Sequence, residues 1–315
     1  MRRTLAVLMD PIEKIKIYKD STFAMLLEAQ KRGYALNYLQ QRGLSIRNGV
    51  AFGQSQGLAV RDDASSWFTL GASSAQPLGS FDVILARLDP PFDTEYLHDT
   101  QMLDMAVAAG SLVVNRPQAV RDFNEKLYTL QFPNCVPRSL VARDPQLLKE
   151  FVLGEGVAVA KILDAMGGAS VFKVSSDDPN LNVILETVTQ EGRQLALVQQ
   201  YLPEISQGDK RILMINGQPV PFALARIPAA GEFRGNLARG GSGVARALTP
   251  RDREIAASVG PALVRNGIYF AGLDVIGDYL TEINVTSPTC IRELDAACGL
   301  NIAGDLFDAL EAELT

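Results

Sequence analysis

The N-terminal part of the chain alternates short apolar runs with longer amphipathic segments. This pattern predicts β-strands at 5–9, 35–39, 81–91 and 111–117, and helices at 21–32 and 94–109. Residues 40–80 are polar, rich in Gly and Ser and weakly periodic, which predicts only short strands and loops. Repeated strand, helix, strand units indicate an α/β fold with an open parallel sheet, whose ligands lie beyond the carboxyl ends of the strands. Asp10, Arg87 and Asn115 are predicted to stand at such ends.

The pattern changes near residue 124. A small α+β lobe is predicted from helices at 124–131 and 144–153 and strands at 157–163, 169–175 and 195–202. Two further strands, KRILMING and PVPFALARIP, precede a glycine-rich loop at 231–243, a helix at 250–266 and a strand hairpin. We therefore predict three units, at 1–122, 123–202 and 203–315.

Composition excludes several classes of protein. The 315 residues are 47% hydrophobic and 21% charged, with a net charge of −6 and no long basic run, so nucleic-acid and membrane partners are not expected. The apolar run at the N-terminus stops at Asp10 and Pro11, too early for a signal or spanning segment. Three cysteines without CxxC spacing suit a reducing cytoplasm, and the single histidine, His98, argues against a catalytic triad or a multi-histidine zinc site.

The stretch LDVIGDYLTEINVTSPT, residues 273–289, places Asp274, Glu282 and Asn284 inside two apolar runs around a Gly-Asp turn. A strict two-residue turn would pair Asp274 with Thr281 and send Glu282 to the other face; a longer or bulged turn would pair Asp274 with Glu282. In the second arrangement, two carboxylates and an amide converge, a donor set that suits Mg²⁺. The alternative is an ordinary edge hairpin whose acids face solvent.

Three other segments have both a functional and an ordinary interpretation. Lys161 precedes a Met-Gly-Gly turn that could cradle phosphate, or could be a simple hairpin turn. Asp209, Lys210 and Arg211 begin a strand, where a solvated charged edge is the more frequent explanation. RGNLARGGSG could be a cationic lid over an anionic reacting group, or a surface loop. No complete Walker or GxGxxG motif occurs, so any phosphate site must be built otherwise.

Taken together, these motifs resemble the ATP-grasp carboxylate-amine ligases. The segments VLMDPI, DSTFAMLLEAQKRGY, DPPFDTEY, NEKLYTLQFP, GDKRILMINGQPVP, FRGNLA and GLDVIGDYLTEINVTSPTCIREL, which span nearly the whole chain in order, resemble more narrowly the bacterial glutathione synthetase family. The resemblance implies an ATP-grasp fold with an N-terminal open-sheet domain at 1–122, a small nucleotide-binding lobe at 123–202 and a catalytic lobe at 203–315. It implies ligation of γ-glutamylcysteine to glycine through an acyl phosphate formed from ATP, and it suggests a homo-oligomer, either a dimer or a tetramer.

The resemblance also implies roles for individual residues. Nucleotide binding would fall to Lys126, Lys161, Asp164, Met166, Gly167, Gly168, Gln200, Tyr201, Leu202 and Asp209. Magnesium, with manganese as the alternative ion, would be held by Asp274, Glu282 and Asn284. The acyl phosphate would face Arg211, Arg234 and Asn236, and the peptide substrate would face Arg87, Ser287, Thr289 and Arg292.

Some positions depart from the family's pattern. Ala165 stands where the family has Gly in its phosphate loop, and Leu88 stands where it has Lys, which would remove a cation from the substrate side. In the lid, Arg239-Gly-Gly-Ser242 replaces Ala-Gly-Gly-Arg. Two alternatives therefore stand beside the family's reaction: a related ligase that uses another dipeptide or amine, and a nucleotide-binding relative with weakened catalysis.

Overall fold

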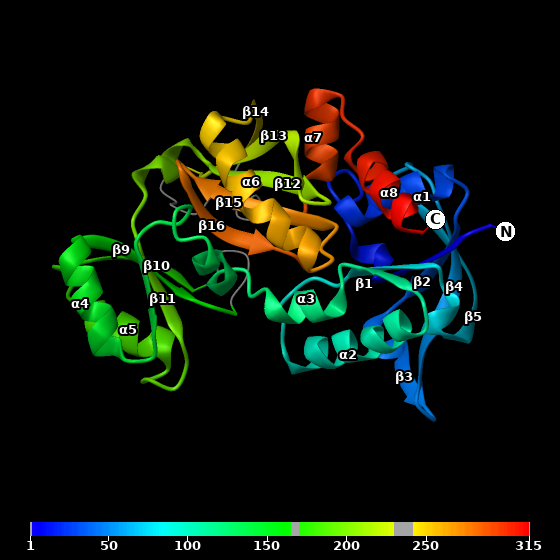
Figure 1. Ribbon diagram of the computed structural model, residues 1–315, viewed down its shortest axis with the longest axis horizontal. Coiled ribbons are helices and arrows are strands. Elements are labelled where there is room, and N and C mark those ends of the chain that lie inside the picture. The colour runs from blue at the N-terminus through cyan, green and yellow to red at the C-terminus, as the bar shows by residue number, and fades with distance from the viewer. Residues whose placement is uncertain (1, 165–169, 230–241, 315) are drawn as a thin grey trace.

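The strands gather in three separate sheets (Figure 1). The structure is a computed structural model that describes residues 2–164, 170–229 and 242–314. In those residues, no helix is both long enough and apolar enough to cross a membrane.

The first sheet is mixed, with a parallel centre. Its order is β3-β4-β2-β1-β6-β7, with β5 paired to β4. β1 pairs in parallel with β2 and β6, and β6 pairs in parallel with β7, which confirms the predicted parallel units. Arg87 closes β6, and Asp10 and Asn115 directly follow β1 and β7, as predicted. The bounds are β1 Thr4–Met9, β2 Ala35–Leu39, β3 Leu44–Arg47, β4 Val50–Val60, β5 Phe68–Pro77, β6 Val83–Arg87, β7 Leu112–Val114, α1 Ser21–Lys31, α2 Thr94–Ala108 and α3 Pro117–Asp122.

The prediction for residues 40–80 was wrong. They form two long antiparallel strands, β4 of 11 residues and β5 of 10 residues. The inward positions of β4 include the small residues Ala51, Gly53 and Ser55, so hydrophobicity alone does not reveal the period of two. Gly53 is required by the packing, because a Cβ there would lie 2.8 Å from Leu39 Cδ2.

The second sheet is antiparallel, in the order β10-β9-β11-β8. Two helices share a buried apolar cluster with it, and the second of them, α5, has no counterpart in the sequence prediction. Residues 124–131 do not form the predicted helix; they contain only a short 3₁₀ helix, η4 (Leu127–Gln131). The bounds are β8 Ser139–Ala142, β9 Val157–Ile162, β10 Val171–Ser175, β11 Ala196–Gln200, α4 Pro145–Glu155 and α5 Leu181–Thr189.

The third sheet is also antiparallel, in the order β14-β13-β12-β15-β16. Helix α6 begins at a capping box in which Thr249 and Asp252 satisfy each other's backbone N–H groups. The strand β14 lies partly in the range predicted to be a loop. The bounds are β12 Asp209–Ile215, β13 Gln218–Ile227, β14 Ser242–Ala247, β15 Phe270–Ile276, β16 Tyr279–Asn284, α6 Pro250–Arg265, α7 Ile291–Cys298 and α8 Ile302–Glu313.

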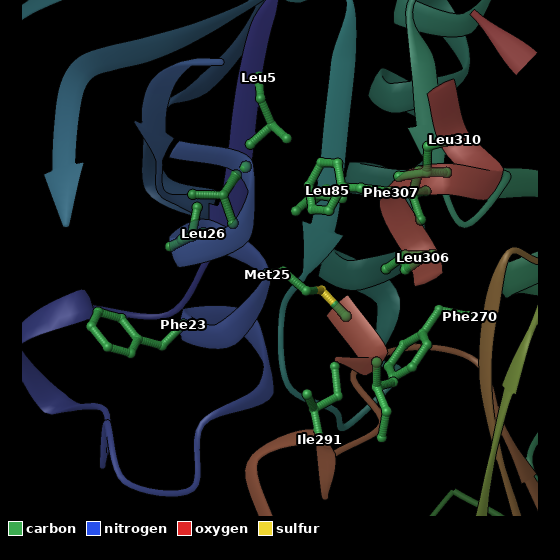
Figure 2. Close-up of a cluster of buried hydrophobic side chains, with 14 of the residues drawn as sticks. Leu5, Phe23, Met25, Leu26, Leu85, Phe270, Ile291, Leu306, Phe307 and Leu310 are labelled. Atoms are coloured by element: carbon green, nitrogen blue, oxygen red, sulfur yellow. The ribbon is translucent and has the colours of Figure 1, made fainter. Parts of the chain in front are cut away.

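The chain's end returns to the first sheet. Figure 2 shows Leu306, Phe307 and Leu310 of α8 in one cluster with Leu5 and Leu85 of the first sheet, and all five are fully buried. Each such side chain contributes roughly 1.5–3 kcal/mol by leaving water. Helix α8 therefore fastens the C-terminal lobe to the N-terminal sheet.

Asn115 makes a second connection between these lobes. Its Nδ2 donates to Phe270 O and Val285 O, both at 2.7 Å, and its Oδ1 accepts from the N–H groups of Tyr269 and Phe270. Both residues that accept from Nδ2 belong to or directly follow the β15–β16 hairpin. This buried amide thus holds the carboxyl edge of the first sheet against the base of the hairpin.

Candidate active site

The β15–β16 hairpin has a two-residue turn and a bulge. Ile276 pairs with Tyr279 across Gly277 and Asp278, and Val275 pairs with Leu280. The register then shifts, so that Asp274 lies opposite Glu282 and Thr281 is the extra residue. The prediction that these two acids share one face is confirmed in its bulged form, because directly opposite residues project to the same side of a sheet.

Asp274 is a buried carboxylate held by two arginines. Arg211 donates to it from Nε at 2.5 Å and from a terminal nitrogen at 2.9 Å, and Arg226 approaches its Oδ2 at 2.9 Å. Asn284 Nδ2 lies 3.3 Å from the same Oδ2, so Asn284 also belongs to this face. Burial alone would raise the pKa of Asp274, but the two guanidinium groups hold it well below its usual value.

Glycine at position 272 makes room for this arrangement. A Cβ there would lie 2.8 Å from Arg211 Cδ and 3.1 Å from Pro288 Cβ. Arg211 can therefore lie flat along β15 and reach Asp274 with both of its donating nitrogens. At the charged start of β12, where a solvated edge is the more frequent arrangement, Arg211 is buried and Asp209 and Lys210 are half-buried.

Arg226 is a site residue that sequence reasoning missed. It lies on β13 directly opposite Asp209 and pairs with that carboxylate at 2.5 Å as well as with Asp274. Burial raises the pKa of Asp209 to about 6, and Arg226 only partly opposes this. Asp209 Oδ1 and Arg226 Nε are buried and lack a hydrogen-bond partner within the described part of the chain. In the sequence, Arg226 is only a cation inside a mostly apolar strand, and this does not indicate which acids it meets.

Lys126 stands between two acids at the edge of the hairpin. Its side chain is 2% exposed, it pairs with Glu125, and its Nζ lies 4.0 Å from Glu282 Oε1. Burial opposes the charge of Lys126, but the two carboxylates outweigh burial and raise its pKa. Burial and the nearby Glu282 raise the pKa of Glu125 to about 7. The segment that precedes η4 and the strand β16 therefore bring a lysine and two carboxylates together.

Lys161 approaches the same region from the second sheet. It lies on β9, between Leu197 of β11 and Val171 of β10, and is 8% exposed. Burial lowers its pKa, and the charge of Glu282 acts in the opposite sense. Asp164 follows β9, is exposed, and accepts a hydrogen bond from Asn124 Nδ2 at 3.2 Å. A buried lysine with no anionic partner among the residues that the structure describes suits an anionic ligand such as a phosphate.

The residues expected to meet adenine lie at the end of β11. Gln200 and Tyr201 are half-buried and Leu202 is buried. Lys173 of β10 places its Nζ 4.0 Å from the centre of the Tyr201 ring. Gln199 has a buried Nε2 with no hydrogen-bond partner among the described residues. This strand end therefore offers an apolar residue, an aromatic ring and unused amide capacity side by side.

The residues expected to face the peptide substrate lie at the end of β6 and in the chain from the end of β16 into α7. Arg87 is 5% exposed and donates to Thr22 Oγ1 at 3.0 Å and to Pro288 O at 2.8 Å. Arg292 is instead engaged with Asp62, at 2.7 and 3.1 Å. Ser287 is half-buried and Thr289 is exposed, both in the segment that leaves β16.

Leu88 does not face this side. Its side chain is buried in the apolar cluster with Leu8 and Tyr96, and its carbonyl accepts from the Tyr96 hydroxyl. The expectation that Leu88 removes a cation from the substrate side was wrong, because neighbouring residues point to opposite sides of an extended segment and Arg87 takes the other one.

A cavity of about 270 Å³ opens beside Glu125. Its lining combines apolar and polar residues of the first domain and of the segments that follow β9 and β16, among them Phe92, Phe123, Glu125, Asp164 and Thr286. Five expected ligands, Met166, Gly167, Gly168, Arg234 and Asn236, lie outside the described residues, as do Ala165 and Arg239.

The donor set of the hairpin fits a hard divalent cation. Asp274, Glu282 and Asn284 supply oxygens from one face, and the pKa values of Glu125 and Asp209 are raised by burial and by surplus negative charge nearby. A cation there would neutralise that surplus. In the described ranges, no group of three or more His, Cys, Asp or Glu side chains is placed to hold a metal by itself, so an ion would need the amide and further oxygens from a ligand.

Solved structures share this fold. The D-cycloserine synthetase DcsG aligns over 99% of this chain and 100% of its own, with a TM-score of 0.68 and 12% identity. The ATP-grasp ligase PsnB, in complex with a minimal precursor, Mg and ADP, aligns over 99% and 97%, with a TM-score of 0.62 and 18% identity. The three sheets therefore have the fold of an ATP-grasp ligase.

Family comparison narrows this class. The model of the prokaryotic glutathione synthetase N-terminal domain matches residues 4–121, and that of its ATP-grasp domain matches residues 125–299. A glutathione synthetase of Xanthomonas campestris pv. campestris is 59% identical over 312 residues, 99% of both chains. That of Pseudomonas aeruginosa is 56% identical over 310 residues, 98% of both. The chain belongs to the prokaryotic glutathione synthetase family.

Proposed function

We propose that this protein joins γ-glutamylcysteine to glycine with consumption of ATP. The γ-phosphoryl group of ATP passes to the cysteinyl carboxylate, the amine of glycine attacks the resulting acyl phosphate, and phosphate leaves as the amide bond forms. Membership of the glutathione synthetase family over residues 4–299 carries this proposal. The chemistry needs positioning and charge neutralisation rather than a nucleophilic side chain, and the gathered lysines, arginines and acids are consistent with that requirement.

The lysines would hold the nucleotide. Lys126 and Lys161 would face its phosphates with Asp164 beside them, and residues 166–168 would cover them. Gln200, Tyr201 and Leu202 would meet adenine, and Asp209, which pairs with Arg226, would also belong to the nucleotide site. Burial supports these roles, since each lysine carries its charge into a low-dielectric cleft where a phosphate is bound strongly.

The hairpin would hold the metal. Asp274, Glu282 and Asn284 would bind Mg²⁺, or Mn²⁺, which neutralises charge on the transferring phosphoryl group. Arg211, Arg234 and Asn236 would face the acyl phosphate. Arg87, Ser287, Thr289 and Arg292 would face the peptide substrate. For Arg292 this requires exchange of its present partner Asp62, an exposed pair that is held weakly.

Product analysis tests the reaction. Purified protein is incubated with ATP, Mg²⁺, γ-glutamylcysteine and a panel of amines, and the products are weighed by mass spectrometry. We expect glutathione with glycine and no comparable product with larger amines. Turnover only with another amine or dipeptide would point to a related ligase, and nucleotide binding without ADP release would point to a catalytically weakened relative.

We propose that the chain divides at 1–122, 123–202 and 203–315 and works in the cytoplasm. The strands of the three sheets lie within 4–114, 139–200 and 209–284, which supports the division. All three cysteines are free, in keeping with a reducing compartment.

We further propose a homo-oligomer, and the sheet edges support it. β5 is a ten-residue edge strand without a charged side chain, and residues 71–75 are exposed on both faces. The other described edges are short, carry a charge, or, like β16, donate backbone hydrogen bonds to the carbonyls of residues 125 and 135. An unprotected edge invites another strand, and a second β5 could pair with it about a two-fold axis without opposing like charges.

A further inference from the structure

Three elements meet where the peptide substrate is expected. Arg87 at the end of β6 bonds Thr22 in the first turn of α1, and the N–H of Ile291 at the start of α7 donates to Ser21 Oγ at 3.1 Å. The guanidinium of Arg292 lies 5.8 Å from the centre of the Phe23 ring. The carboxyl edge of a parallel sheet and the starts of two helices thus enclose one region, the usual position of a ligand in such folds.

Glu293 brings an unsatisfied carboxylate into this region. Its Oε2 is buried and has no hydrogen-bond partner within the described ranges. Burial raises the pKa of this carboxyl, and the charges of Lys19, Asp20 and Arg292 also act on it. Buried polar atoms nearly always have a hydrogen-bond partner. The described residues provide no donor for this oxygen, so we expect a bound ligand to provide one.

Asp20 is a second acid, and its charge acts on both Glu293 and Arg87. Its carboxylate caps α1 by accepting from Phe23 N at 2.6 Å. Burial raises its pKa, and Arg87 and Asp89 are among the charges that act on it. Asp20 therefore caps the same helix turn whose Thr22 binds the buried Arg87 guanidinium, and an acid near a guanidinium complements the ammonium and carboxylate of an amino-acid head group.

We propose that Glu293, with Asp20 beside it, binds the α-ammonium group of the γ-glutamyl donor, while Arg87 faces the α-carboxylate of the same group. This inference rests on the proposed function, because γ-glutamylcysteine carries one cationic group and that group is at its γ-glutamyl end. Glu293 is then a specificity-determining residue: it acts on the end of the donor remote from the carboxylate that is activated.

A purely structural role for Glu293 makes a different prediction. An acid in the first turn of a helix interacts favourably with the helix dipole, and Glu293 occupies that position in α7. Such a role affects stability, but it does not depend on whether the donor carries an ammonium group.

Kinetics with two donors separate these roles. The full-length protein is assayed at saturating ATP, Mg²⁺ and glycine with γ-glutamylcysteine and with glutarylcysteine, which lacks only the α-amino group. In the unchanged protein we expect kcat/KM for glutarylcysteine to be lower by at least about tenfold, the value of one charge-assisted hydrogen bond. Glu293→Gln should lower kcat/KM for γ-glutamylcysteine by a similar factor, mainly through KM, and change that for glutarylcysteine by less than about twofold.

The matched control is Glu95→Gln, which removes an acid from the first turn of α2 instead. It should leave kcat/KM for both donors unchanged. If Glu293→Gln fails to fold, Glu293→Asp withdraws the carboxylate by one methylene and should reduce the preference for the ammonium-bearing donor several-fold.

Two outcomes would overturn the inference. One is an equal loss for both donors in Glu293→Gln, and the other is an unchanged preference in the variants. A protein that makes no glutathione from γ-glutamylcysteine and glycine would instead refute the proposed function. A protein that makes glutathione but uses the two donors equally would refute only the role of Glu293.

Discussion

Replacement of Asp274 by Asn removes one buried negative charge at almost constant volume. Asp274 is 3% exposed and meets Arg211 at 2.5 and 2.9 Å and Arg226 at 2.9 Å. At an effective dielectric constant of about 20, a contact of this length carries about 5–6 kcal/mol of Coulomb energy, most of which desolvation offsets. Loss of one partner from a buried pair costs about 3–5 kcal/mol. We expect the lower end, about 3 kcal/mol, because Asp209 still pairs with Arg226.

Urea unfolding of the nucleotide-free protein, followed by far-UV circular dichroism, measures this loss. A loss of about 3 kcal/mol lowers the midpoint by roughly 1 M or more, given the usual denaturant dependence. The measurement is made without Mg²⁺, so that no metal ion is added to the two arginines and Asn284 as partners of Asp274.

Glu282→Gln is the matched control on the opposite strand. Glu282 is 25% exposed at its side chain and lies 4.0 Å from Lys126, so its loss should cost less than about 1 kcal/mol. Both variants should lose Mg²⁺-dependent turnover. An unchanged midpoint for Asp274→Asn, or equal shifts for the two variants, would refute the account of Asp274 as the buried partner of two guanidinium groups.

Three further predictions concern charge and assembly. The pKa of Glu125 is about 7 in the folded protein against 4.5 for the free carboxyl, so its contribution to stability is present below 4.5 and is lost as the pH rises through 7. Glu125→Gln should therefore flatten the fall in urea midpoint between about pH 5 and about pH 8, and equal slopes would contradict this. Lys161→Met should raise the midpoint of the nucleotide-free protein and weaken ATP binding at least about tenfold by calorimetry, unlike Lys149→Met on α4. Ser73→Lys on β5 should lower the molar mass measured by light scattering, whereas Val244→Lys on β14 should not; the same mass for both variants would exclude β5 as the interface.

The register of the hairpin shows where sequence reasoning stops. Strand alternation places Glu282 and Asn284 on one face, but it leaves open whether Asp274 joins them. The answer depends on Thr281, the extra residue of the bulge, and nothing in the local pattern identifies it. A shift of one residue exchanges the faces of a strand, so a single bulge decides whether the acids can share an ion.

Buried charge was equally hard to predict. Lys126, Lys161, Arg211 and Asp274 could be selected because they belong to motifs of a known family. Arg226 could not, because it is one cation in an otherwise apolar strand and its partners, Asp209 and Asp274, lie on two other strands. Which charges meet is a property of strand order in the sheet, and strand order is set by long-range packing.

By itself, the sequence determined the parallel strand and helix units of the first domain, the start of α6, the presence of a hairpin with acids, and the family. These features depend on local periodicity, on capping residues and on motifs contiguous in the chain. Only the tertiary structure decided that α8 covers the first sheet, that β4 and β5 pair at length, and that Glu293 stands near Asp20. An apolar helix face or a strand edge specifies that it must be covered, but not by which distant segment, because burial is nearly indifferent to the identity of the partner.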